Sequence, residues 1–416
     1  MKRIVVLGGG FAGLWSAIGA ARKLDEHGIG QDAVRVTLVD QNDFHSIRVR
    51  NYEEELDATV VPFAQVLDPI GVEHLRGVVA GIDTERRAVS VRTAAGVQEL
   101  RYDRLVHALG SRLQRPSIPG LAEHSFDIDT YHGAKRLDAH LHALARDGRE
   151  PDRLRVLVVG AGLTGIELAT ELPGRLAKMA AQASDRPTPR VILADASPLI
   201  GPDMGDEARA VIVEALAALG VDTRTGVAIE SVDPRGVTLA GGERMAAATV
   251  VWCAGMRANE LGEAFPAARD RLGRLEVDEF MRVRGLPHVF AAGDAARAVL
   301  DGEHASVMSC QHGRPMGRYA GHNAAADLIG QSMLPLRIDW YVTVLDLGGW
   351  GAVYTGGWDR RVISTREAAK ATKRTINRLR IYPPLSGDRA EILAAAAPQV
   401  QEPPEVRRLA RAADGR

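Results

Sequence analysis

Residues 3–14 read RIVVLGGGFAGL, and this stretch decides the fold. A short apolar strand enters a glycine-rich turn of the G-x-G-x-x-G type, and a helix-forming run follows. Gly8 permits the tight turn, Gly10 lets the backbone approach a pyrophosphate, and Gly13 lets the helix pack close to the strand. Because the start of the helix leaves free N–H groups aimed at phosphates, the pattern predicts a dinucleotide-binding unit.

The flanking sequence supports this interpretation. Residues 14–24 favour a helix, and residues 34–39 favour a second apolar strand that ends in Asp40. A carboxylate at that position is placed to accept both hydroxyls of a ribose. The interval from Gly13 to Asp40 is longer than usual, and we interpret residues 26–30 as an extra loop.

Four more residues near this turn are candidates for cofactor contact. Phe11 and Ala12 lie inside the glycine pattern, and Gln41 follows the second strand. Ligands bind at the carboxyl ends of the strands in open α/β sheets, so this segment faces the expected site. His45 lies a few residues further on and has two readings: it faces a cofactor, or it satisfies loop backbone.

Composition excludes several classes of protein. A chain of 416 residues suits two or three domains, and 46% hydrophobic with 25% charged residues is ordinary for a globular protein. The formal net charge of -1 gives no field that would attract nucleic acid. Cys253 and Cys310 form no CxxC pair, which removes a dithiol relay, and we predict no metal site. No apolar run is long enough to span a membrane, so we expect a cytoplasmic protein, with peripheral membrane attachment left open.

The glycine pattern occurs a second time. A strand at 155–159 enters GAGLTG at 160–165, a helix follows at 166–172, and the next strand, 191–194, ends at Asp195. The candidate contacts in this second unit are the residues of its turn, Gly160, Gly162, Leu163, Thr164 and Gly165.

Two such units imply two dinucleotides, one for each Rossmann-like domain. Asp195 has no arginine immediately beside it, and its charge would repel a 2′-phosphate. We therefore expect NADH in preference to NADPH.

Three later strands end in small residues that let backbone lie against a flat ligand. The strand and turn at 105–111 contain Gly110, and residues 249–255 end at Gly255. Residues 289–296 combine a strand, a tight turn at Gly293 and the carboxylate of Asp294. Alternating segments at 78–83, 88–91, 99–106, 227–232 and 236–239 are typical of antiparallel strands.

In this order the motifs resemble the two-dinucleotide-binding-domain flavoproteins of the pyridine nucleotide-disulfide oxidoreductase superfamily, and within it the type II NADH dehydrogenases (NADH:quinone oxidoreductases). The resemblance covers roughly Lys2 to Asp327. It implies FAD on the first unit, with Asp294 at the ribityl chain, NADH on the second, and a quinone as the leading electron acceptor. It also implies an α/β fold of two Rossmann-like domains with a small C-terminal α+β region. The expected limits are 1–115 and 261–330 for the FAD domain, 116–260 for the NAD(P)H domain and 331–416 for the C-terminal region.

The resemblance also assigns two catalytic residues. Glu167 matches a family glutamate near the nicotinamide and the flavin, where it positions the nicotinamide or relays protons to a quinone. The alternative is a carboxylate at a helix start, stabilised by the macrodipole. His312 replaces a family glutamine and would donate a proton to the reduced acceptor, unless it is a structural histidine. Cys310 lies near the isoalloxazine or is simply buried.

The segment 306–312 departs from the family pattern, which keeps other functions open. These are a soluble reductase of another electron carrier, an oxidase that uses oxygen, and a redox sensor with slow turnover. The C-terminal region is predicted to hold two strands within 340–355, with four aromatic residues that line the acceptor site or form a core. A basic helix over 365–379 follows. It contacts a membrane surface through 365–380, is solvated, or forms a homodimer contact, and residues 402–416 resemble a loose tail.

Overall fold

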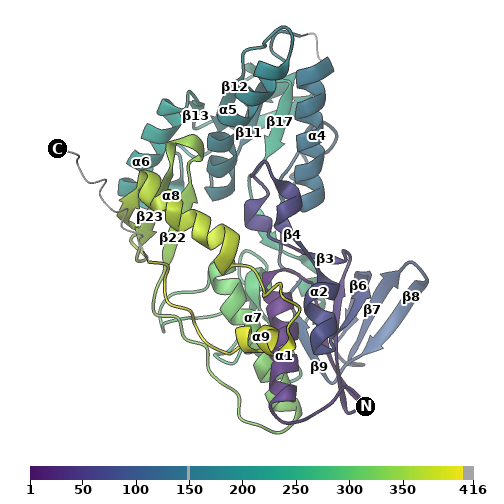
Figure 1. The fold of residues 1–416 in the computed structure, drawn as a ribbon. Coiled ribbons are helices and arrows are strands. Elements are labelled where there is room, and N and C mark those ends of the chain that lie inside the picture. The colour runs from purple at the N-terminus through teal and green to yellow at the C-terminus, as the bar shows by residue number, and fades with distance from the viewer. Residues whose placement is uncertain (148–149, 406–416) are drawn as a thin grey trace, which may run out of the picture.

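The computed structural model describes residues 1–147 and 150–405. Two parallel sheets dominate it, one in each half of the molecule (Figure 1). The first sheet has five strands in the order β20-β9-β1-β2-β5, and the second has four in the order β13-β12-β11-β17. The strands of the first are β1 (Lys2–Leu7), β2 (Val34–Asp40), β5 (Glu73–Arg76), β9 (Arg104–His107) and β20 (Val289–Ala291). Those of the second are β11 (Arg155–Val159), β12 (Arg190–Ala194), β13 (Asp222–Arg224) and β17 (Thr249–Trp252).

Each parallel sheet is accompanied by a three-stranded antiparallel sheet, so the repeat seen in the sequence extends to the topology. The first consists of β6 (Val78–Asp83), β7 (Ala88–Thr93) and β8 (Gly96–Arg101). The second consists of β14 (Ile229–Asp233), β15 (Gly236–Leu239) and β16 (Arg244–Ala246). The prediction of an α/β fold with two Rossmann-like sheets is confirmed. The domain limits themselves stay a prediction.

Three smaller pairings and several helices complete the two halves. The paired strands are β3 (Phe44–Ser46) with β4 (Val60–Pro62), β10 (Ser111–Leu113) with β18 (Met256–Ala258), and β19 (Leu275–Glu276) with β21 (Ala296–Arg297). The helices are α1 (Phe11–Asp25), α2 (Phe63–Leu67), α3 (Leu121–His124), α4 (Tyr131–Asp147), α5 (Leu163–Gln182), α6 (Gly205–Ala218) and α7 (Cys310–Leu328).

Close helix packing brings the distant segment 310–328 onto the first unit. Helix α7 lies against α1, and glycines make the approach possible: a Cβ on Gly321 would lie 1.9 Å from the carbonyl oxygen of Ser16. The strand β1 is apolar on both faces and fully buried from Ile4 to Leu7, as expected for a central parallel strand. The first turn and the start of α7 therefore stand side by side.

The C-terminal region runs along both halves of the molecule (Figure 1). It consists of β22 (Val342–Asp346), β23 (Ala352–Gly356), β24 (Arg361–Thr365), α8 (Arg366–Thr375) with a π-helical turn over Ile376–Arg380, and α9 (Arg389–Ala395). Leu345 and Val353 belong to the core of the second sheet, whereas Ile392 belongs to the core of the first. Residues 406–416, most of the predicted tail, lie outside the described residues.

Three features differ from the sequence prediction. Helix α5 continues through Pro173 to Gln182, well beyond residue 172. The segment 99–106 divides between β8 and β9, because the Asp103 carboxylate accepts the N–H of Arg3 at 2.7 Å and turns the chain into the parallel sheet. Strand β24 and helix α9 were not predicted. Within the described residues, no helix is both long and apolar enough to cross a membrane.

Buried histidines predict a stability that depends on pH. Burial lowers the pKa of His45, His107, His312 and His322 to about 4 each. The unfolded chain binds these protons near pH 6.5 and the folded chain does not, so stability falls as the pH drops below that value. Each of these histidines should lower the free energy of unfolding by about 2 kcal/mol as the pH falls from 6.5 to 5.

We expect His107→Leu to lose less stability than the parent on moving from pH 7 to 5, measured by chemical unfolding. His27→Gln, at an exposed position, is the control. An equal loss in the parent and in His107→Leu would contradict this assignment.

Candidate active site

The first glycine turn lies between β1 and α1. It is tightly packed at Gly8 and Gly13 and open at Gly10. Gly8 has φ +93°, and its N–H donates to the carbonyl of Val39 at 2.8 Å. A Cβ on Gly13 would lie 1.7 Å from the carbonyl oxygen of Gly8, so only glycine fits there. At Gly10 no atom comes within 4 Å of a Cβ position. The turn therefore offers open backbone at Gly10, where a pyrophosphate can approach.

The second turn repeats this geometry between β11 and α5. Gly160 has φ +108°, and a Cβ on Gly165 would lie 1.8 Å from the carbonyl oxygen of Gly160. Gly162 again has open space, and Leu163 and Thr164 are exposed at the start of the helix. Both turns have the shape that a dinucleotide requires.

The aspartates at the strand ends hold these turns. Asp40 accepts the N–H of Gly9 at 2.6 Å and that of Asn42 at 2.8 Å. Asp195 accepts the two corresponding backbone N–H groups of the second unit. Burial raises the pKa of Asp40. Since a carboxylate has about four acceptor positions, each aspartate retains capacity for ribose hydroxyls.

His45 lies beneath the first turn. Its ring is buried, its Nδ1 donates to the carbonyl of Gly9 at 2.9 Å, and the ring of Phe11 meets it edge-on at 5.0 Å. This contact with the backbone matches the second of the two predicted roles, and contact with a cofactor stays a prediction. Gln41 is exposed beyond β2, and Ala12 is buried against Gly293.

The strand end at β20 brings three polar side chains together. Asp294 accepts the hydroxyl of Ser111 at 2.6 Å, and the Arg48 guanidinium lies 3.8 Å from the same carboxylate oxygen. Gly110 and Gly293 both have positive φ, +67° and +68°, and let the chain turn beside this group. Arg48, which sequence reasoning did not single out, thus lies beside Asp294, the residue predicted to contact the ribityl chain.

The cysteines do not form a redox pair. Cys253 and Cys310 are both free, and burial raises the pKa of each thiol, that of Cys253 to about 12. Neither favours the reactive thiolate. Gly255, with φ +80°, lines a cavity of about 340 Å³ together with Gln114 and Trp252, apart from the main cavity described next.

A cavity of about 810 Å³ joins the two halves and the C-terminal region. It runs from the second turn, at residues 162–164, past Glu167 and Arg48 to the start of α7. Its outer wall comes from the C-terminal region, including residues 340–345. Of the four aromatic residues noted in the sequence, Trp340 and Tyr341 line the cavity, and so does Trp358, which was not predicted. The ring of Tyr341 stacks on that of Trp358 at 4.3 Å.

His312 lies behind the cavity wall. Its side chain is fully buried, and Nδ1 accepts the N–H of Val307 at 2.9 Å. Val307 and Gln311 line the cavity on either side of it. With a pKa lowered to about 4 by burial, the ring is neutral near pH 7. This arrangement matches the structural alternative, and the role of proton donor stays a prediction.

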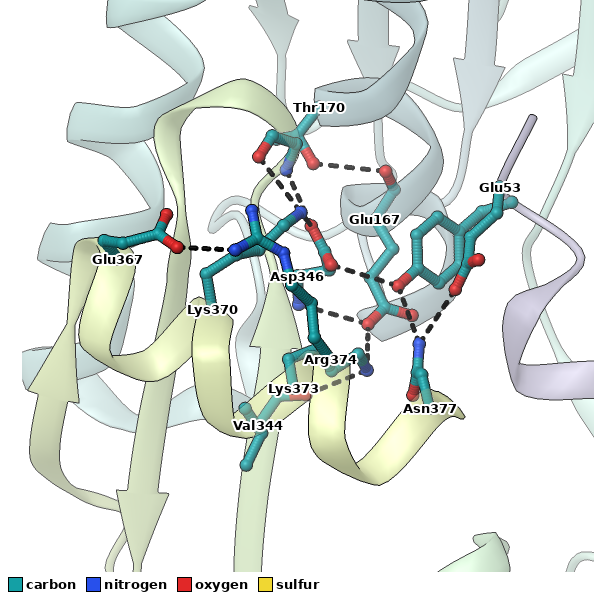
Figure 2. A network of polar contacts seen from close by, with 12 residues as sticks. Glu53, Glu167, Thr170, Val344, Asp346, Glu367, Lys370, Lys373, Arg374 and Asn377 are labelled. Atoms are coloured by element: carbon teal, nitrogen blue, oxygen red, sulfur yellow. Dashed lines mark hydrogen bonds and ion pairs between the residues drawn. The ribbon is translucent and has the colours of Figure 1, made fainter. Parts of the chain in front are cut away.

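The carboxylate of Glu167 belongs to a buried network of hydrogen bonds and ion pairs that links α5 to the C-terminal region (Figure 2). Its Oε1 accepts hydrogen bonds from the ammonium of Lys373 at 2.7 Å and from the backbone N–H of Asp346 at 3.2 Å. Lys373 also donates to the carbonyl of Val344 at 3.0 Å. The hydroxyl of Tyr52 donates to Asp346 at 3.2 Å, which connects the network to the first half of the chain.

Burial and neighbouring charges shift the pKa values of this network in opposite directions. Burial raises the pKa of Glu167, and the neighbouring Lys373 cation only partly offsets it. Burial alone would lower the pKa of Lys373, but the carboxylates of Glu167 and Asp346 leave it above its ordinary value. Lys370 pairs with Asp346 as well. The result is a compact, charge-balanced cluster at the cavity wall.

The basic helix over 365–379 was predicted to contact a membrane surface, to be solvated or to form a homodimer contact, and the inward position of Lys373 was not foreseen. Lys373 is 8% exposed and faces inward. The signal was present in the spacing, because Lys373 follows Ala369 by one turn and precedes Asn377 by one turn. All three are buried and so lie on the same inward face of the helix.

Comparisons with known proteins agree with this geometry. Residues 2–317 match the pyridine nucleotide-disulphide oxidoreductase family. A NADH dehydrogenase-like protein of Mycobacterium tuberculosis is 58% identical over 97% of this chain and all of its own length. A type II NADH:quinone oxidoreductase of Staphylococcus haemolyticus is 27% identical over 89% of this chain and 96% of its own. NDH2 from Plasmodium falciparum, solved in complex with NADH, has the same fold with a TM-score of 0.76 at 13% identity, over 94% of this chain and 97% of that one.

The ion pair predicts a strong energetic coupling between Glu167 and Lys373. Either Glu167→Gln or Lys373→Gln alone leaves one buried charge unpaired and should cost about 3–5 kcal/mol of unfolding free energy. The double variant should cost clearly less than the sum, which a double-mutant cycle by chemical unfolding would measure.

The exposed pair Glu367 and Arg374 on the same helix is a matched control, with side chains 55% and 52% exposed. Its coupling should stay below about 1 kcal/mol. Additive losses at Glu167 and Lys373 would contradict the buried pair.

Proposed function

The chain belongs to the pyridine nucleotide-disulphide oxidoreductase family, and we propose that it is an FAD-dependent NADH dehydrogenase that passes electrons to a quinone. The observation that carries this proposal is the continuous cavity. It extends from the second glycine turn past Glu167 to the C-terminal wall, so a reduced nucleotide and an acceptor can reach the same space.

The residues present fit both cofactors. FAD would be held by the open backbone at Gly10, by Asp40 and by Asp294, and NADH by the second turn and Asp195. Bound FAD supplies the two-electron chemistry, since it takes a hydride from NADH and releases electrons to an acceptor. The carboxylate of Asp195 favours NADH, because Arg190 lies at the other end of β12 and donates to Asp222 at 2.7 Å.

Glu167 supplies protons at the acceptor side. Quinone reduction consumes two protons, and a carboxyl group whose pKa is raised by burial exchanges protons closer to neutral pH. Lys373 and the N–H of Asp346 both bind Oε1, so we assign the exchange to Oε2. Lys373 holds the carboxyl group in place and balances its charge when it is ionised.

Membrane contact is a second part of the proposal, limited to the end of the basic helix. Leu379 is 71% exposed beside the exposed Arg378, whereas the lysines of α8 face inward. An exposed apolar side chain beside an exposed cation suits the surface of an anionic membrane. The same turn is the place where a homodimer contact would form instead.

The first test is the reoxidation of enzyme that NADH has reduced without oxygen. We expect menadione or ubiquinone-1 to restore the flavin absorbance rapidly, and air to do so much more slowly. Preference for ferricyanide alone would favour another electron carrier. If none of these acceptors works, the quinone proposal is wrong and a slow redox sensor is favoured.

Glu167→Gln should slow reoxidation by quinone about a hundredfold, the scale of general acid catalysis. In the parent, the donated proton is available below the raised pKa of Glu167, so the rate should fall as the pH rises through that pKa. The variant should lack this fall. Glu171→Gln is the matched control, because Glu171 lies one turn along α5, outside the cavity lining, and burial also raises its pKa. An unchanged pH profile in Glu167→Gln would remove Glu167 from the proton path.

A further inference from the structure

Helix α7 presents one basic face to the cavity. Cys310, Arg314 and Arg318 follow one another at intervals of four residues, so they lie on the same side of the helix, and all three line the cavity. The arginines stand about 6 and 12 Å along the helix axis from Cys310. We call Arg314 and Arg318 the arginine pair.

The arginine pair is buried without a neutralising partner. Arg314 is 7% exposed and Arg318 is 4% exposed, and the Nε–H of each has no hydrogen-bond acceptor among the described residues. Arg314 donates to the side-chain oxygen of Gln401 at 3.3 Å, and Arg318 donates to the carbonyl of Gln399 at 3.4 Å. Both acceptors are uncharged.

Trp15 supports the pair through its ring. The guanidinium of Arg318 lies 4.3 Å from the ring centroid and that of Arg314 lies 5.1 Å from it. Arg380 adds a third positive charge to the cavity lining, and it donates to the carbonyl of Glu402. In the part of the chain that the structure describes, none of these three arginines has an ion pair with a carboxylate.

Such an arrangement is unfavourable unless an anion completes it. Burying a charged group is costly, and proteins normally pair it. Elsewhere in this cavity they do so, since Lys373 has Glu167 and Arg274 has Asp270. Burial and mutual repulsion lower the pKa of Arg314 to about 9, and burial lowers that of Arg318 to about 10, which is a sign of missing anionic partners.

We propose that the arginine pair binds an anionic group on the electron acceptor, so that the preferred acceptor is a quinone or similar flat molecule with a carboxylate, sulfonate or phosphate substituent. This inference rests on the proposed function for the identity of the ligand as an acceptor. The planar guanidinium groups suit bidentate contact with such an anion.

The test measures binding to the oxidised holoenzyme, so it does not depend on turnover. The probes are anthraquinone-2-sulfonate and its neutral analogue 2-(hydroxymethyl)anthraquinone, titrated by calorimetry. Arg318→Gln should raise the Kd of the sulfonate at least tenfold, as expected for a lost hydrogen bond to a charged group, and should change that of the neutral probe much less. Arg318→Lys should restore part of the affinity, and added salt should weaken only the sulfonate.

Arg92→Gln is the matched control, because it removes the same charge from an exposed position outside the cavity lining. The proposal is overturned if Arg318→Gln weakens both probes equally or if the control variant has the same effect. A fall in the ratio of flavin to protein in Arg318→Gln would also overturn it, because the pair would then serve the diphosphate of FAD. Selective binding of the sulfonate by an enzyme that no quinone reoxidises would leave the anion site standing and remove the quinone function.

Discussion

The buried ion pair between Glu167 and Lys373 is the interaction on which the arrangement of the cavity depends. It joins the first turns of α5 to the C-terminal helix at 2.7 Å, across 206 positions of sequence. Its members are removed from water, so removing either one leaves the other with a large desolvation cost. Together with the packing of Leu345 and Val353 in the core of the second sheet, the pair holds the C-terminal region on the second half of the molecule, where that region forms the outer wall of the cavity. Tyr52 and Asp346 extend the same network to the first half.

The glycine turns impose a second, purely steric constraint. At Gly13 and Gly165 a side chain would strike the carbonyl oxygen of the preceding turn, while Gly10 and Gly162 leave backbone open toward a ligand. These requirements are local, because each concerns a few consecutive residues between a strand and a helix. For that reason the sequence was sufficient to predict that the chain contains two Rossmann-like sheets and where along the chain the two glycine turns lie.

The rest of the site depends on contacts between distant segments, which no local pattern reveals. Arg48 reaches Asp294, and Lys373 reaches Glu167, only because the two halves and the C-terminal region fold together. A lysine in a basic helix is usually solvated, so the charge pattern of 365–380 favoured an exposed surface. Similarly, the pattern could not distinguish a histidine that faces a cofactor from one that satisfies backbone. In the described structure His45 bonds to the carbonyl of Gly9, and whether it also faces a cofactor stays a prediction.

The two ends of the cavity differ in how their charges are balanced, and this difference bears on function. At Glu167 the chain supplies both members of the pair, so the local charge is satisfied before any ligand binds. At Arg314 and Arg318 the chain supplies only the cations, an aromatic ring and uncharged oxygen atoms. The folded protein bears the cost of these desolvated charges without a ligand, and an incoming anion removes it. Because only an anionic ligand relieves this cost, the unpaired arginines make the site selective for the charge of the ligand.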